Sequence, residues 1–165
     1  MIRCGAVVAA AAALAVAGCG GGKKTTTTET PQKAAFIKAA DTICAQGNQA
    51  IAGYEQKIGG LTSSADASRF FSEAPALIRE ATAATRRYVD RLDAVPAPAQ
   101  DKPKLDAWRA NVRRQVDLLD STADAIDAKD TQRAQALSSQ IDALNKRNNA
   151  FARSYGMKAC SETLG

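Results

Sequence analysis

The sequence predicts an all-α domain, an antiparallel up-down-up-down four-helix bundle, placed behind an export signal and a flexible linker. Three observations favour this fold class. Alanine, leucine, glutamine and charged residues dominate residues 33–165, whereas β-branched and aromatic clusters are scarce. Apolar and small residues recur there at steps of three and four, the spacing of one helix face. Strong breaks fall at Gly59-Gly60, at residues 96–98 and at Gly156, and four helical stretches of similar length fit between these breaks and the short connection around Lys129.

The first eighteen residues are organised like an export signal. A short basic start that ends at Arg3 precedes an uninterrupted apolar run over residues 6–17. This run is too short to cross a hydrocarbon core of ~30 Å, which takes about 20 residues, but its length is typical of a signal-peptide core. Residues 1–18 are therefore interpreted as a signal peptide.

The apolar run ends in Val16-Ala17-Gly18-Cys19, which resembles the lipobox of bacterial lipoproteins. The resemblance implies that Cys19 becomes the first residue of the mature chain and carries a diacylglycerol thioether with acyl chains such as palmitate. Two chains anchor a protein stably, because each buried CH₂ contributes about 0.8 kcal/mol. The alternatives are an ordinary secretory signal with a chance cysteine, or a buried hairpin strand. The flexible tract that follows favours the anchor.

Residues 19–32 are expected to form the lipidated start and a flexible linker. Residues 20–32 offer no apolar side chain whose burial would offset the entropy of ordering them. A tract of this length and composition has a root-mean-square reach of roughly 20 Å. The run Thr25–Thr28 is consistent with O-linked sugar and equally with a plain solvated spacer.

The first helix is expected to begin at Thr30, an N-cap residue, with Pro31 at the first helical position that proline favours. It is expected to run to about Lys57, because Gly59-Gly60 is typical of a turn. The second helix is expected after Ser63-Ser64. These two elements form the first hairpin of the predicted bundle.

The third helix is expected to open at Asp101, after the break at residues 96–98, and the fourth near Asp130-Thr131. Gly156 stands where a left-handed C-terminal cap belongs. An extended coiled coil is the alternative architecture. The short connection around Lys129 argues against it, because so few residues force the chain into a helical hairpin.

Residues at steps of three and four are expected to face the core. In the first two helices they are Ile37, Ala40, Cys44, Gly47, Ile51, Tyr54 and Ile58, then Phe71, Ala74, Ile78, Ala81, Thr85, Tyr88 and Leu92. In the last two they are Leu105, Val112, Val116, Leu119, Ala123 and Ile126, then Ala134, Leu137, Ile141, Leu144, Asn148, Phe151 and Tyr155. Trp108 is expected on the flank of this face.

Two cysteines, Cys44 and Cys160, remain after processing and lipidation, since Cys4 lies in the leader. Outside the membrane, disulfides persist. In an up-down-up-down bundle the tail after Gly156 starts at the pole where the first helix begins, so it can fold back towards Cys44. A disulfide between Cys44 and Cys160 is therefore predicted. A redox pair or a metal site is the alternative, but the chain has no CxxC motif.

The chain contains no histidine, which excludes several classes of catalytic and metal site. Ser-His-Asp and Cys-His machinery, imidazole zinc sites and histidine-ligated haem all require it. Glu73 and Glu80 lie one heptad apart and could pair as acid and base, although a solvated ion-pair face explains them as well. We expect no enzyme, no metal and no cofactor.

Three polar residues interrupt the predicted core near one end of the bundle: Tyr88, Asn148 and Tyr155. A buried asparagine often fixes helix register or partner choice. The alternative interpretation is a small polar pocket for an organic ligand, lined by these three side chains.

Basic residues are expected to collect at the pole where the linker enters, and acidic residues at the opposite pole. The candidates for contact with a surface are Arg86, Arg87, Arg113, Arg114, Lys146 and Arg147. Matching of the helix dipole does not explain the third helix, which begins basic and ends acidic. We therefore expect this pole to face anionic lipid or a cell-wall polymer; drift in surface charge is the alternative.

The string from Phe36 to Cys44, FIKAADTIC, together with Tyr155-Gly156 and Cys160, resembles small lipoproteins of GC-rich actinobacteria. These proteins are helical and carry one early and one late cysteine. The resemblance covers the anchor and the surroundings of the two cysteines. It implies a location and a disulfide, and no mechanism.

Taken together, these features predict a non-enzymatic lipoprotein on the outer face of the cell membrane, with residues 33–165 as a binding or structural module. The expected partners are the membrane, through the lipid, and an envelope protein that the sequence does not identify; nucleic acid is not expected. The alternative function is a small-ligand binder that uses the Tyr88, Asn148 and Tyr155 end.

Overall fold

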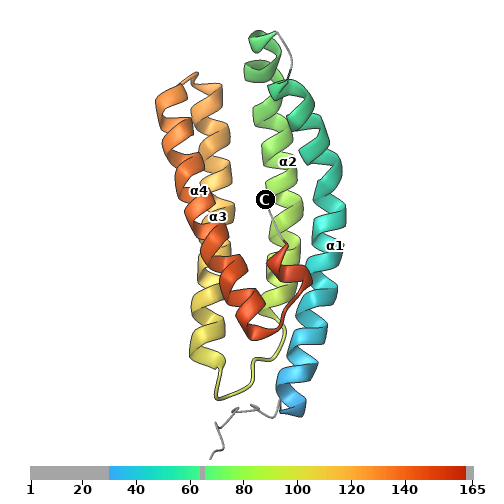
Figure 1. Cartoon of the computed structure of the whole chain (residues 1–165). Coiled ribbons are helices and arrows are strands. Elements are labelled where there is room, and N and C mark those ends of the chain that lie inside the picture. Colours follow the sequence, from blue (N-terminus) through green and yellow to red (C-terminus); the bar gives the residue numbers. More distant parts are fainter. Residues whose placement is uncertain (1–29, 64–65, 163–165) are drawn as a thin grey trace, which may run out of the picture.

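The chain folds into four long helices that run up and down in turn (Figure 1). This computed structural model describes residues 30–63 and 66–162. Its elements are α1 (Pro31–Thr62), α2 (Ala67–Asp93), α3 (Lys102–Asp127), α4 (Thr131–Tyr155) and the short 3-10 helix η1 (Ala159–Ser161). The predicted all-α four-helix bundle is confirmed. The predicted signal peptide, the lipidation site Cys19 and the linker up to residue 29 lie outside the described residues.

Side-chain caps begin three of the helices. Thr30 accepts a hydrogen bond from the backbone N–H of Lys33, 3.3 Å away, and Pro31 follows as the first helical residue. The Asp130 carboxylate accepts from the backbone N–H of Arg133 at 2.9 Å. These bonds satisfy amides at the helix starts that have no partner within the helix. The predicted starts of α1 and α4 are confirmed.

The predicted end of α1 near Lys57 is wrong, because the helix continues through Gly59-Gly60 to Thr62. Leu61, in this last turn, is buried. The hydroxyls of Thr62 and Ser63 both donate to the carbonyl of Gly59, which closes the helix end. Burial of one leucine and these local bonds offset the cost of about 0.5–1 kcal/mol that each glycine carries in a helix.

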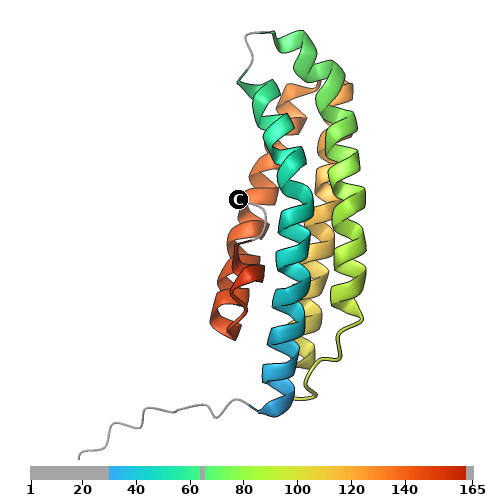
Figure 2. The ribbon, with the colours of Figure 1, turned by 90° about the vertical axis from the view of Figure 1, so that its right-hand side faces the viewer.

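Consecutive helices pack on each other, α1 on α2, α2 on α3 and α3 on α4. The fourth side of the bundle, between α4 and α1, is different, because the C-terminal segment packs on both of these helices. In Figure 1 and Figure 2 this segment, drawn in red, lies between these two helices in the lower half of the bundle. We call the half with the start of α1 and the end of α4 the proximal half, and the half with the α1–α2 and α3–α4 connections the distal half.

The main core lies in the proximal half. Its buried members are Phe36, Ala40, Ile43, Cys44, Leu92, Leu105, Trp108, Ala152, Tyr155, Met157 and Cys160. Trp108, expected on the flank, is inside this core with 4% of its surface exposed. Phe36, which the spacing did not select, is buried in this core, and Ile37, which it did select, is partly buried and packs against it.

The distal half is more open than the sequence predicts. Tyr54, Ile58, Ile78, Leu119 and Ile141, all expected in the core, are only partly buried. The spacing of these residues is helical, as expected, but α1 and α4 do not pack closely on each other, and all five residues line an open groove. No helix within the described ranges is both long and apolar enough to cross a membrane.

Candidate functional site

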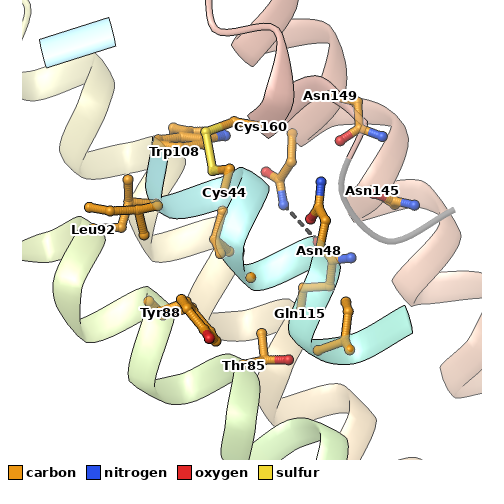
Figure 3. A pocket seen from close by; sticks show the side chains of 16 residues that line it. Cys44, Asn48, Thr85, Tyr88, Leu92, Trp108, Gln115, Asn145, Asn149 and Cys160 are labelled. Atoms are coloured by element: carbon orange, nitrogen blue, oxygen red, sulfur yellow. Dashed lines mark hydrogen bonds between the residues drawn. A yellow bond between two sulfur atoms is a disulfide. The ribbon is translucent and has the colours of Figure 1, made fainter. Parts of the chain in front are cut away.

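A cavity of about 60 Å³ lies inside the bundle, next to the bond between Cys44 and Cys160. All four helices contribute to its wall, and η1 contributes Cys160. Leu92, Trp108 and Tyr88 lie on one side of it (Figure 3). By the rule that one buried water occupies about 10–15 Å³, this space holds about four to six waters, or an organic group of similar size.

Five amide side chains line the cavity. They are Asn48 of α1, Gln115 of α3, and Asn145, Asn148 and Asn149 of α4. Figure 3 shows those of Asn48, Gln115, Asn145 and Asn149 on the side opposite Leu92. Gln115 and Asn148 are 3% and 4% exposed, so they are core residues in a position where apolar side chains are the rule.

These amides are only partly hydrogen-bonded. Asn148 Nδ2 donates to Gln115 Oε1 at 2.9 Å, and Asn48 Nδ2 donates to the carbonyl of Ala159 at 3.3 Å. Four other buried amide atoms have no partner among residues 30–63 and 66–162: Oδ1 of Asn48, Asn148 and Asn149, and Nε2 of Gln115. A buried polar group without a hydrogen bond costs about 1–3 kcal/mol. Water or a polar ligand that bonds to several of these atoms therefore stabilises the folded chain.

The residues that line the cavity include no acid and no base. An ion placed there would lose its hydration without gaining a countercharge, which costs far more than burying a neutral polar group. Amides offer both donors and acceptors. The rest of the wall is mostly apolar, so the chemistry of the cavity fits an uncharged molecule that presents hydroxyl or amide groups to these amides and apolar groups to the remaining wall.

The disulfide forms part of the cavity wall. Cys44 and Cys160 are bonded, with their Cα atoms 5.0 Å apart, so the predicted pairing is confirmed. The Asp41 carboxylate holds the same segment, because it accepts from the backbone N–H groups of Lys158 and Cys160 at 3.0 and 3.3 Å. Covalent and hydrogen-bonded attachment together fix the C-terminal segment over one end of the cavity.

Two of the three residues predicted to form a ligand pocket, Tyr88 and Asn148, line this cavity. The third does not. The hydroxyl of Tyr155 donates to Asp101 at 2.8 Å, and its ring lies edge-on against Phe36, with centroids 5.9 Å apart. The inclusion of Tyr155 was wrong because a residue seven positions after Asn148 lies two turns further along α4, in the proximal core.

Sequence reasoning missed Asn48, Gln115, Asn145 and Asn149. A signal for two of them was present, since residues 145, 148 and 149 follow the steps of three and four that mark one helix face. Asn48 stands four residues after Cys44, so it lies on the same face of α1. Gln115 gave no such signal, because Val116 beside it fits the apolar pattern.

The candidate surface-binding residues fall into two groups. Arg86 lies 3.1 Å from Asp117 and 2.7 Å from Asp120, and Arg113 pairs with Asp93. The hydrogen bonds to Asp120 and Asp117 raise the pKa of Arg86 above its ordinary value. The charges of Arg86 and Arg113 are therefore largely matched by neighbouring aspartates.

The remaining four candidates keep their charge available. They are Arg87, Arg114, Lys146 and Arg147, which are exposed and have no ion-pair partner within the described part of the chain. A basic surface on α2, α3 and α4 thus rests on these four residues.

Comparison with protein-family models, with curated proteins and with solved structures gave no match.

Proposed function

We propose that this chain is a lipid-anchored extracytoplasmic binding protein without catalytic activity. Its bundle takes up a small uncharged molecule, or an uncharged part of a larger one, in the amide-lined cavity. One observation carries this function: unpaired buried amide atoms surround a cavity whose lining has no charge. The site has no nucleophile activated by a base, since the chain lacks histidine and its two mature core cysteines are bonded to each other.

Ligand binding explains the number of amides around the cavity better than the fixing of helix register does. A single buried amide pair, such as Asn148 and Gln115, is enough to fix register. The further amides Asn48, Asn145 and Asn149 around the same space exceed that need. Their convergence on one cavity from α1 and α4 is the arrangement that fixes the orientation of a ligand.

The test follows the amides directly by NMR, with glycerol as the probe. In the exported domain, residues 20–165, the side-chain NH₂ resonances of Gln115 and Asn148 should shift on titration with glycerol and saturate. The same concentrations of sodium acetate or ammonium chloride should leave them in place. The resonance of Asn111, half-buried on α3 and outside the cavity lining, serves as the internal control.

A variant pair sharpens the result. Asn148→Leu preserves volume and removes one amide, so the glycerol response of Gln115 should weaken. Asn111→Leu makes the same chemical change outside the cavity and should leave that response intact. Uniform small shifts of all amides, or none, would show that the cavity holds water only.

The membrane location has its own test. Cys19→Ala should release the domain from the membrane and leave its helical circular-dichroism spectrum unchanged, because residue 19 precedes α1. A variant that remains membrane-bound and acylated contradicts the lipobox interpretation, whatever the cavity binds.

A further inference from the structure

The distal half contains an open groove of about 390 Å³ that continues from the amide cavity. Three residues, Ile51, Thr85 and Gln115, line both spaces, so they meet at this point. All four helices line the groove, and two of them, α1 and α4, do not pack closely on each other.

Aliphatic side chains from all four helices line the groove, together with polar residues that include Glu55, Ser138 and Asp142. Its wall from α1 includes Ile58, its wall from α4 includes Ile141, and Ile78 and Leu119 come from α2 and α3. All four side chains are only partly buried. Exposure of such apolar surface to water is unfavourable, and covering it with an apolar group contributes about 25 cal/mol per Å² of favourable free energy.

The amide cavity alone is smaller than a typical ligand pocket of about 300–1,000 Å³, but cavity and groove together reach that range. Both linings are mostly apolar, and they differ in where the unpaired polar atoms lie. The unpaired amide oxygens of Asn48, Asn148 and Asn149 lie at the cavity, which has no charged residue, whereas most of the groove surface is aliphatic, with Glu55 and Asp142 among its exposed lining residues. A molecule that fills both has a compact neutral head and an apolar tail.

We infer that the ligand is an uncharged single-chain amphiphile, with its hydroxyl- or amide-bearing head among Asn48, Gln115 and Asn148 and its alkyl chain in the distal groove. This inference rests on the proposed function, because it extends the ligand of the same cavity outward. A second copy of the chain suits the groove less well. The acids Glu55 and Asp142 line it without a lysine or arginine, so two copies face to face would bring like charges together.

The experiment compares probes that share a chain or a head: glycerol, 1-O-octylglycerol, octanoate and octyltrimethylammonium, each below its micelle concentration. Trp108 is the one tryptophan of the chain and lines the cavity, so its fluorescence reports binding together with the NMR shifts. 1-O-octylglycerol should bind at least about 100-fold more tightly than glycerol, since half-burying eight methylene-sized groups contributes that much. The two charged probes should bind at least tenfold more weakly than 1-O-octylglycerol.

Variants of the groove test the binding of the alkyl chain separately from the binding of the head group. Ile58→Asn and Ile141→Asn change opposite walls and should each weaken 1-O-octylglycerol about tenfold, with the glycerol-induced shifts unchanged. Leu118→Asn is the matched control, because Leu118 is also half-buried and lies outside both linings. It should change neither. The use of two separate groove variants keeps the test valid if one of them fails to fold.

The outcomes distinguish the two proposals. If glycerol shifts the amides but the octyl chain adds no affinity, the groove inference is overturned and the proposed function stands. If octanoate binds as tightly as 1-O-octylglycerol and the amide resonances do not move, both fail. Concentration-dependent dimers with no response to any probe would assign the groove to a second copy and overturn the inference.

Discussion

Arg109 illustrates how a single side chain ties the proximal core to the connection between α2 and α3. Only 7% of the residue is exposed. Its Nη2 donates to the carbonyl of Val95 at 2.6 Å, and its guanidinium lies 5.3 Å from the centre of the Phe36 ring. Asp93 and Asp106 lie 3.9 and 3.8 Å away. The charge is therefore buried with partners on several sides.

Replacement of Arg109 should be costly. Arg109→Ala leaves the Val95 carbonyl without its donor and removes packing against Phe36, so we expect a loss of about 2–3 kcal/mol in the free energy of unfolding. Arg114→Ala, on the same helix but exposed and without an ion pair in the described chain, should change it by less than about 0.5 kcal/mol. Urea unfolding of both variants measures the difference. Equal effects would contradict the assignment.

At the residue scale, the sequence predicted part of the candidate site. Asn148 stood out because it interrupts an apolar stripe, and it does line the cavity. Gln115 could not be predicted. A rotation of the helix about its axis by one residue moves a position from the core to the flank, and a sequence pattern does not fix this rotation. Tyr155 was misplaced for a related reason: a hydroxyl at the edge of a core often finds a local partner, here Asp101.

At the scale of one helix, Gly156 ends α4 in the left-handed region, with φ of 102°. The N–H of Met157 donates to the carbonyl of Ala152, and that of Gly156 to Arg153, which is the Schellman arrangement. A Cβ on Gly156 would also lie 3.3 Å from Ile37 Cδ1. Backbone conformation and space both favour glycine at this position.

Two glycine substitutions should therefore have opposite effects. Gly156→Ala should destabilise the fold by about 1–2 kcal/mol. Gly53→Ala, inside α1, should stabilise it by about 0.5–1 kcal/mol, because apart from the neighbouring backbone of α1 no atom lies within 4 Å of the new Cβ. Thermal unfolding of the two variants beside the parent protein checks the sign of each. A stabilising Gly156→Ala would show that α4 does not end as described.

The cap of α2 predicts a pH effect. Hydrogen bonds from the Ser68 side chain and backbone N–H lower the pKa of Asp66 below its ordinary value. Because the folded pKa is lowered, this carboxylate stabilises the fold above the unfolded pKa of about 4, and the contribution is lost as pH falls further. Asp66→Asn keeps a capping side chain that does not titrate.

The measurement is urea unfolding of the parent protein and Asp66→Asn at pH 7 and pH 3. The parent should be the more stable of the two at pH 7, and this advantage should shrink or vanish at pH 3. A difference that is independent of pH would mean that the carboxylate charge does not stabilise α2.

Helix starts were easier to predict than helix ends. Residue types that favour N-caps predict the starts at Thr30, Asp101 and Asp130. All three residues directly precede helices, as expected. The end of α1 was missed because Gly59-Gly60 suggests a turn locally, whereas burial of Leu61 depends on residues far away in the sequence. Tertiary packing overrode the local preference.

At the scale of the whole molecule, the sequence predicted the topology and did not predict the opening of the distal half. Residues at core spacing, such as Ile58 and Ile141, look the same in a closed and an open bundle. The disulfide, in contrast, could be predicted. In a topology that places the C-terminal tail beside α1, Cys44 and Cys160 have only each other as partners. Both cysteines belong to the main core of the proximal half.

Reduction of this disulfide should lower stability strongly. The bond spans 116 positions of sequence, and closing a loop of that size contributes about 4–5 kcal/mol in the chain-entropy model. Thermal unfolding with and without reductant should show a lower melting temperature after reduction. Helix content at 25 °C should stay the same, because Asp41 still holds the C-terminal segment. An unchanged melting temperature contradicts the prediction.

The proximal half of the bundle is expected to face the membrane. In the lipid-anchored protein proposed above, a linker before α1 with a reach of roughly 20 Å would bring the basic residues of the proximal half close to the lipid surface. Each lysine or arginine near an anionic surface contributes about 1 kcal/mol at best. Since Arg86 and Arg113 are paired with aspartates, attraction should depend on Arg87, Arg114, Lys146 and Arg147.

The unlipidated domain should bind vesicles that contain phosphatidylglycerol at low salt and leave them at high salt, because screening shortens the electrostatic range to about 8 Å at 0.15 M. Changing Arg87, Arg114, Lys146 and Arg147 together to Glu should abolish binding in a vesicle sedimentation assay. The same change at the distal residues Lys57, Arg69, Lys129 and Arg133 gives a protein of equal net charge and should weaken binding far less. Equal loss in both proteins would show that net charge, and not the proximal pole, determines the attraction. Equal retention on neutral and anionic vesicles would exclude an electrostatic contact altogether.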